Sequence, residues 1–217
     1  MGSIDTMMLL GDTFVELSEN LPFDKISVSD IVAASQKNRK TFYYHFESKT
    51  HLIRWIFRSD LARMLRDRFE ESQLVFEPMT EESMPDLPYY VRLKTGVRSL
   101  DSSEFLRAFA DVLQERKTYY RRALRSNEPD SLRTYLINLY TPALEDDIRF
   151  ILSNRWLSES SIRFLAEFYS GAIITYIITK LSTSDDEDIL EDMKHFTNIV
   201  HSSLEEQINQ QQLRRMA

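Results

Sequence analysis

The sequence contains no cysteine, and this absence excludes disulfides, thiol nucleophiles, thiolate zinc sites and iron–sulfur clusters. Only 4 glycines and 6 prolines occur in 217 residues, too few for a loop-rich β-sandwich or a glycine-cornered barrel. The opening MGSIDTMMLL lacks a positively charged start and has a short apolar stretch, so it does not resemble a secretory signal. The longest apolar-looking run, 171–179, is too short to cross a bilayer. We therefore expect a cytoplasmic protein with no membrane partner.

The composition is that of a globular protein, with 42% hydrophobic and 28% charged residues. The net charge of −7 argues against a surface that binds nucleic acid everywhere, but it allows one local basic patch. Apolar residues recur at helical spacing through most of the chain, whereas alternation with a period of two never persists. These patterns predict an all-α fold.

Capping residues and periodicity divide the chain into segments. Helices are expected over residues 4–17, 27–34, 38–46, 49–69, 89–99, 102–126 with a break near Lys117, 130–152 with a restart at Pro142, 159–182 and 185–211. Ser27 with Asp30, and Ser184 with Glu187, are typical of capping boxes. A proline-rich loop is expected after Phe76. We predict an amino-terminal domain at 1–48, followed at 49–217 by a connecting helix and a carboxy-terminal helical bundle for regulation and dimerisation.

A basic island lies at 36–49, where four positive residues stand against one acid, whereas 1–34 carries one positive residue against six acids. The short helix expected there has Phe42 and Phe46 on one face, positioned to pack inward. The opposite face combines cations with tyrosines. Lys and Arg bind phosphates or guanine edges, and hydroxyl groups fix the register on the backbone, so this face is suited to the major groove.

The candidate DNA contacts are the polar residues that surround this helix. They are Ser27, Ser29, Lys37, Asn38, Arg39, Lys40, Thr41, Tyr43, Tyr44, His45 and Lys49. The alternative interpretation is a solvated basic helix face. Tyrosines that flank cations on a surface favour DNA contact, while the two serines are helix caps first and phosphate donors second.

The run Thr41-Phe42-Tyr43-Tyr44-His45-Phe46, followed by Ser48-Lys49 and Leu52, resembles the signature of the TetR/AcrR family of transcriptional regulators. The lead-in PFDKISVSDI at 22–31 is also similar, and the resemblance covers about 5–53. It implies a three-helix helix-turn-helix domain followed by a helical effector and dimer domain. The run ERKTYYRRAL at 115–124 loosely resembles a subgroup that includes activators of dihydroxyacetone kinase operons.

The turn before the short helix departs from the family pattern, which usually has glycine, an apolar residue and serine. This chain has Gln36, Lys37 and Asn38. We expect Gln36 either to adopt a left-handed backbone at a cost or to reshape the turn. Lys37 replaces a small residue that normally fills the core, so its stem is expected to extend along apolar surface. Asn38 is an acceptable N-cap.

Aromatic residues crowd the carboxy-terminal helices. At helical spacing they are usually core, whereas the family resemblance implies a pocket for an aromatic or amphipathic effector. The pocket candidates are Tyr119, Tyr120, Tyr135, Phe150, Trp156, Phe168 and Tyr176. A protein co-regulator is the alternative source of control.

Two apolar stripes, in 159–182 and 185–211, predict a homodimer through a four-helix bundle. The interface candidates are Ile173, Ile177, Met193, Phe196, Val200 and Leu204. The alternative is that 185–211 packs within one subunit.

No catalytic, metal or cofactor site emerges from the sequence. His195 and His201 lie six apart rather than at ligand spacing, and neither a glycine-rich phosphate loop nor a nucleophile motif occurs. We therefore predict a non-enzymatic, sequence-specific regulator whose dimer reads a palindromic operator in double-stranded DNA, controlled by a small ligand or a protein partner. The alternatives are a helical interaction module that has lost DNA binding and an activator that works with a protein co-regulator.

Overall fold

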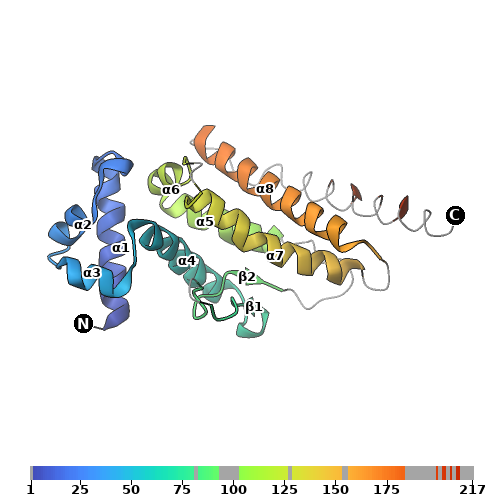
Figure 1. Cartoon of the computed structure of the whole chain (residues 1–217), viewed down its shortest axis with the longest axis horizontal. Helices are drawn as coiled ribbons and strands as arrows, with labels where there is room; N and C mark the ends of the chain where they lie inside the picture. The colour runs from blue at the N-terminus through green and yellow to red at the C-terminus, as the bar shows by residue number, and fades with distance from the viewer. Residues whose placement is uncertain are drawn as a thin grey trace.

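The computed structural model of the chain describes residues 2–80, 83–92, 103–126, 129–152 and 156–183, together with 199, 202, 203, 206, 209 and 210. The regular secondary structure of this part is helical apart from one short antiparallel strand pair, which confirms the all-α class. Three amino-terminal helices lie at one end of the molecule, and α4 leads from them into the larger helical body (Figure 1).

The helices follow one another with few breaks. At the amino-terminal end these are α1 (Ser3–Asn20), the 3-10 turn η1 (Phe23–Lys25), α2 (Val28–Ala34), α3 (Arg39–His45) and α4 (Lys49–Arg68). The remaining elements are η2 (Glu71–Gln73), β1 (Leu74–Val75), β2 (Tyr90–Val91), α5 (Ser103–Glu115), α6 (Lys117–Ala123), α7 (Leu132–Leu152) and α8 (Glu159–Thr183).

The predicted elements agree with the structure in most places. The break near Lys117 is confirmed as the boundary between α5 and α6. The helix expected over 89–99 is wrong at its start, because Tyr90 and Val91 form β2 and pair with β1. The helical restart at Pro142 is also wrong, since α7 continues through that residue. The last predicted helix, 185–211, lies outside the described residues except at a few positions.

One apolar core runs from the three amino-terminal helices through α4 into α7 and α8. α1 crosses α4 closely at Gly11, where a Cβ atom would lie 3.2 Å from Cγ1 of Ile56 and 3.3 Å from Cζ3 of Trp55. A second cluster fills the far end between α7 and α8, around Ile148, Leu157 and Leu165. Because the main core is shared, the amino-terminal helices are packed directly on the larger body.

α8 is the helix of the described chain that is long and apolar enough to cross a membrane, judged by length and composition. It packs along α7 (Figure 1), and Ile162, Tyr169, Ile174, Ile177 and Leu181 on it are buried. Its apolar composition is thus accounted for by core packing, as in a buried helix of a globular domain.

Candidate nucleic-acid interface

The start of α2 is fixed by a capping box, as the sequence predicted. The Ser27 hydroxyl accepts a hydrogen bond from the Asp30 backbone N–H at 3.3 Å and donates one to Oδ2 of Asp30 at 2.7 Å. The Ser27 backbone N–H also donates to Oδ2 of Asp30 at 2.8 Å. The hydrogen bonds from the Ser27 hydroxyl and backbone lower the pKa of the Asp30 carboxyl, which keeps a negative charge at the positive end of the helix dipole.

The turn between α2 and α3 is a Schellman motif. The Lys37 N–H donates to the Val32 carbonyl at 2.9 Å, and the Gln36 N–H donates to the Ala33 carbonyl at 3.3 Å. Gln36 has φ 54°, and among the described residues it is the non-glycine residue with a positive φ. Glycine usually occupies this position because a Cβ atom clashes there. Of the two outcomes expected for Gln36, the structure has the left-handed backbone.

Replacing Gln36 with glycine is expected to stabilise the protein by about 1 kcal/mol, because the steric cost of the left-handed residue disappears. The hydrogen bonds of the turn are made by backbone atoms and remain. Urea unfolding monitored by circular dichroism measures the change. Gln36→Ala is the control, since it removes the same side chain but keeps Cβ and should not produce the gain. A glycine variant no more stable than the alanine variant would contradict this account of the turn.

α3 is held in place by its cap and its inward face. Oδ1 of Asn38 accepts hydrogen bonds from the Thr41 N–H at 2.8 Å and from the Thr41 hydroxyl at 3.1 Å. Phe42 and Phe46 are fully buried, with ring centroids 5.7 Å apart, and Phe46 packs edge-on against Trp55 of α4 at 5.5 Å. A helix of seven residues is unstable alone, so this packing determines its orientation.

The opposite face of α3 points to solvent. Arg39 and Lys40 are exposed, Tyr43 is 51% exposed and Tyr44 is 80% exposed. Within the described part of the chain, neither Arg39 nor Lys40 takes part in a hydrogen bond or an ion pair. The His45 ring stands edge-on to Tyr44 at 4.8 Å. This face therefore offers two cations and two hydroxyl groups to whatever lies against it.

The other predicted contact residues lie around this face, and one of them, Lys49, has a structural role. Ser29 is exposed in the first turn of α2, and Lys37 is half-buried, as its position in the turn suggested. Nζ of Lys49 donates to the carbonyls of Ile26 at 3.0 Å and Phe23 at 3.4 Å. Lys49 thus fastens the segment between α1 and α2 to the start of α4, a role that the sequence did not reveal.

α6 connects the amino-terminal helices to α8 through arginines. Nη2 of Arg116, just before α6, lies 2.8 Å from Oδ1 of Asp12 on α1, and Arg122 donates to main-chain carbonyls at the end of α1, those of Ser18 and Leu21. Nε of Arg121 donates to the Leu181 carbonyl at the end of α8, at 3.0 Å. Sequence reasoning noted this arginine-rich run only as a loose resemblance, since nothing in it shows which elements it meets.

A buried carboxylate supports the same junction. Asp60 of α4 accepts a hydrogen bond from the Tyr120 hydroxyl at 2.6 Å and lies 3.5 Å from Nε of Arg116. Burial raises the pKa of Asp60, a shift opposed by Tyr120 and Arg116. The adjacent Tyr119 ring lies 6.0 Å from the Phe14 ring, so α6 also belongs to the core of the amino-terminal helices.

A cavity lies between α5, α7, α8 and β2, with an empty volume of about 410 Å³ including its open mouth. Its lining in the described residues consists of Tyr90, Phe105, Leu106, Phe109, Tyr140, Leu144, Ser170, Ile173, Ile174 and Ile177.

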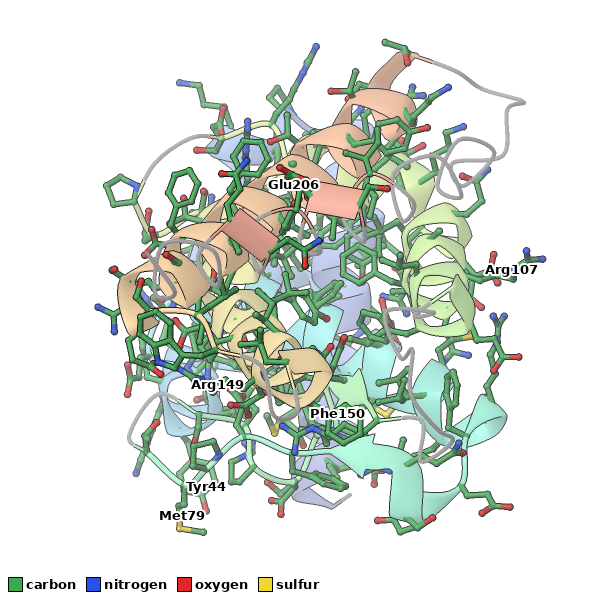
Figure 2. All side chains as sticks on the ribbon, turned by 90° about the vertical axis from the view of Figure 1, so that its right-hand side faces the viewer. Tyr44, Met79, Arg107, Arg149, Phe150 and Glu206 are labelled. Carbon is green, nitrogen blue, oxygen red and sulfur yellow. The ribbon has the colours of Figure 1, made fainter. Side chains whose placement is uncertain are left out.

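The seven pocket candidates lie elsewhere, and this corrects the sequence prediction for this cavity. Tyr119 and Tyr120 are fully buried in the core. Tyr135 and Tyr176 are half-buried, and the Tyr135 hydroxyl meets Nη1 of Arg58 at 3.0 Å. The other three are exposed, namely Phe150, Trp156 and Phe168. Phe150 lies beside Arg149 towards the end of α7 (Figure 2). The spacing of these aromatic residues in the sequence does not show which rings lie together in the folded chain.

One of the dimer candidates, Ile177, needs correction. Ile173 and Ile177 line the cavity, and Ile177 is only 1% exposed within a single subunit. Ile177 therefore faces the interior of its own subunit. The other four candidates, Met193, Phe196, Val200 and Leu204, lie outside the described residues.

The capped helix α2, the tight turn after it and the outward-facing helix α3, which pack together on one core, form a helix-turn-helix unit. The chain is a DNA-binding transcriptional regulator. Residues 15–55 match the family model described as bacterial regulatory proteins, tetR family, and residues 101–211 match that of a transcriptional regulator C-terminal region. Because the second match covers half of the chain, the chain belongs to the TetR family.

A curated relative and a solved structure are similar to it. The HTH-type dhaKLM operon transcriptional activator DhaS of Lactococcus lactis subsp. lactis (strain IL1403) is 35% identical over 65 residues, which make up 30% of this chain and 35% of that protein. The match thus spans about a third of the relative's length. A solved structure, the dihydroxyacetone kinase operon activator DhaS, aligns with a TM-score of 0.58 and 16% identity over 93% of this chain and 97% of that chain. This second likeness supports the fold.

Proposed function

We propose that this regulator acts as a homodimer that places two copies of α3 in successive major grooves of a palindromic operator, about 34–36 Å apart. The observation that carries the proposal is the outward face of α3, where Arg39, Lys40, Tyr43 and Tyr44 are all exposed. We assign base or phosphate contacts to these four residues first. The DNA-binding domain in this proposal is 1–48, and 49–217 regulates and dimerises.

The remaining predicted contact residues act around this face. The Asn38 and Thr41 side chains are occupied with each other, so they set the start of the reading helix and touch a phosphate only secondarily. Ser27, Ser29, Lys37 and His45 border the face. Lys49 positions the segment before α2 through two carbonyl groups.

Selection of genomic fragments by the purified protein tests this function. We expect enrichment of an inverted repeat whose half-sites are centred one helical turn apart, since a two-fold dimer presents its reading helices in that way. Absence of any enriched sequence would favour the interaction module that has lost DNA binding. Enrichment of a lone half-site would contradict the dimeric mechanism.

The outer face of α8 is the surface we propose for dimerisation, in place of Ile177. Phe164 is 63% exposed and Phe168 is 58% exposed, and their rings are stacked with centroids 6.2 Å apart. Gly171 follows on the same face, and no atom lies within 4 Å of the position its Cβ would take. Stacked apolar rings beside a small residue suit the close approach of a helix from a second copy.

Phe168→Glu is therefore expected to give a monomer that keeps its helical content, because burying two carboxylates across the two-fold axis is costly. Light scattering at micromolar concentration measures the mass. Met79→Glu is the control, because it adds the same charge to a residue that is 85% exposed in the loop before β2. A dimeric Phe168→Glu variant would rule out this face.

We further infer control by a ligand in the cavity of 49–217, transmitted through α6. Phe109 of the cavity wall packs on Phe57 of α4 at 5.4 Å, and Phe57 packs on Tyr120 of α6 at 6.2 Å. Ile177 of the wall lies one turn before Leu181, whose carbonyl accepts from Arg121. A ligand that prefers one arrangement of these elements changes DNA affinity by its difference in binding to the two states.

The similar proteins are described as operon activators, and we propose activation for this chain as well. A protein co-regulator is the second candidate for control. We place the protein in the cytoplasm and assign it no enzymatic role. Identifying what co-purifies with the full chain distinguishes the two modes of control. A small molecule would support control by a ligand, and a protein would support control by a co-regulator.

A further inference from the structure

We propose that Arg121 and Arg122, neighbours on α6, are positioning residues that fix the distance between the two copies of α3 in the dimer. They thereby determine the half-site spacing that the protein accepts. This inference rests on the proposed dimeric function and names the residues that set its geometry. In Figure 1, α6 lies between the amino-terminal helices and the end of α8, and the two arginines bind these neighbours.

Arg122 caps the carboxyl end of α1. Its Nη1 donates to the Ser18 carbonyl and, at 3.3 Å, to the Leu21 carbonyl. The usual donor to the Ser18 carbonyl would be the N–H four residues on, but Pro22 stands there and has none. A guanidinium group also interacts favourably with the negative end of the helix dipole. Arg122 therefore supplies a hydrogen bond that α1 cannot make for itself, and it ties α1 to α6.

Arg121 makes the matching contact on the other side of α6. Its Nε donates to the Leu181 carbonyl at 3.0 Å, and Leu181 is fully buried near the end of α8. α8 also carries Phe168, on the face that we propose for dimerisation. Because adjacent residues hold the two helices, the path from the dimer face to α1 passes through α6 at one point.

The core holds α6 itself in place. Tyr119 and Tyr120 are fully buried, and the Tyr119 ring centroid lies 6.0 Å from those of Phe14 and Phe23. The Tyr120 hydroxyl donates to Oδ2 of Asp60 on α4 at 2.6 Å. A closely packed interior transmits a displacement rather than absorbing it, so α6 acts as a rigid spacer between α8 and α1.

Two of the other contacts near this junction are more exposed. The Asp12 side chain, which pairs with Arg116, is 51% exposed. The Thr50 hydroxyl at the start of α4 donates to Oδ2 of Asp130 at 3.2 Å, and this contact lies at the surface. Exposed contacts of this kind contribute little, because water and salt screen them. The positional restraint therefore depends chiefly on the two arginines of α6, whose acceptors are main-chain carbonyls.

Operators of different spacing test the inference. The inverted repeat selected by the protein is compared with repeats that have one base pair added or removed between the half-sites, a change of about 3.4 Å along the axis and about 35° around it. We expect the wild type to bind the altered repeats at least about thirtyfold more weakly, and Arg122→Met to show a penalty of at most about fivefold. Methionine keeps an apolar stem but has no donor. Affinity for an isolated half-site should not change.

Two further variants serve as control and substitute. Arg125→Met is the matched control, because it removes an exposed cation three residues beyond Arg122 and should keep the strict spacing. Arg121→Met removes the contact with α8 and should relax the spacing in the same way, so it serves if Arg122→Met does not fold. An unchanged spacing penalty in the folded Arg122→Met variant, or in Arg121→Met where it takes its place, would overturn the inference.

A second measurement needs no DNA. The chain contains no cysteine, so Glu47→Cys, on the exposed segment after α3, carries one spin label in each subunit. Pulsed electron paramagnetic resonance then measures the distance between the two labels of the dimer. We expect a narrow distribution with Glu47→Cys alone and a broader one when Arg122→Met is added.

The two measurements separate the inference from the proposed function. Equal widths in the two labelled proteins refute the positioning role, whether or not the protein binds an operator. If the distribution broadens but the protein enriches no DNA sequence, the positioning role stands and the proposed reading of an operator fails.

Discussion

Replacing Arg39, Lys40 and Tyr43 together with alanine is expected to lower operator affinity by about a thousandfold or more. Each base or phosphate contact contributes roughly 1–3 kcal/mol, and three losses on one helix face multiply. All three side chains point to solvent, so the inward packing of α3 on Phe42 and Phe46 is untouched. The variant should therefore keep its circular dichroism spectrum and nearly its melting temperature.

Fluorescence anisotropy over a range of salt concentrations measures this loss. The plot of log affinity against log salt should also become shallower, by about one unit for each phosphate contact removed. Arg107→Ala is the control, because it deletes an exposed cation on α5, far from α3, and should change neither quantity. Full operator affinity in the triple variant would disprove the assignment of α3 as the reading helix.

Arg58→Ala is expected to cost about 3–5 kcal/mol of folding free energy. The guanidinium group is completely buried and is paired with Glu77. It also donates to the Leu87 carbonyl and to the Met84 carbonyl, and it lies over the Tyr89 ring at 5.3 Å. Its removal leaves Glu77 without its charged partner and the two carbonyls without this donor, and it opens a cavity beside α4. The Met84 N–H still donates to Oε2 of Glu77 at 3.1 Å.

Urea unfolding of matched variants measures this cost. Arg63 lies on the same helix as Arg58 and forms an exposed ion pair with Glu115. Arg63→Ala removes this ion pair and should cost at most about 1 kcal/mol. Arg58→Lys keeps the charge but has fewer donors, so its stability should lie between those of the alanine variant and the wild type. A loss below 1 kcal/mol in Arg58→Ala would show that the loop before β2 does not depend on this residue.

The start of α3 could be predicted from sequence because its determinants are local. Ser27 and Asp30 cap α2 within four residues, Asn38 caps α3, and the residues at four-residue spacing, Phe42 and Phe46, define the buried face. The identity of residue 36 restricted the turn to two outcomes, of which one is present. Each of these features depends only on residues a few positions away in the sequence.

Segment 89–92 shows where local information is insufficient. Two tyrosines and a valine fit a helix or a strand, and the decision is made by hydrogen bonds to distant residues. The Tyr89 N–H donates to the Val75 carbonyl at 3.0 Å, and the Arg92 N–H donates to the Gln73 carbonyl at 2.8 Å. Arg58 of α4 then fixes the loop between β1 and β2. The sequence gives no indication that this loop packs on α4.

The sequence by itself determined the helical class, the approximate extent of the first four helices and the outward basic face of α3, because periodicity, caps and charge act over a few residues. The end of α1 was the exception, since the helix runs three residues beyond the predicted Leu17 to Asn20. Only the tertiary structure decided which side of α8 is interior. Apolar residues occur all around that helix, so spacing alone could not distinguish the inward Ile177 from the outward Phe168. The cavity depends on the same choice, because its walls come from four elements whose contact is fixed by packing between distant parts of the chain.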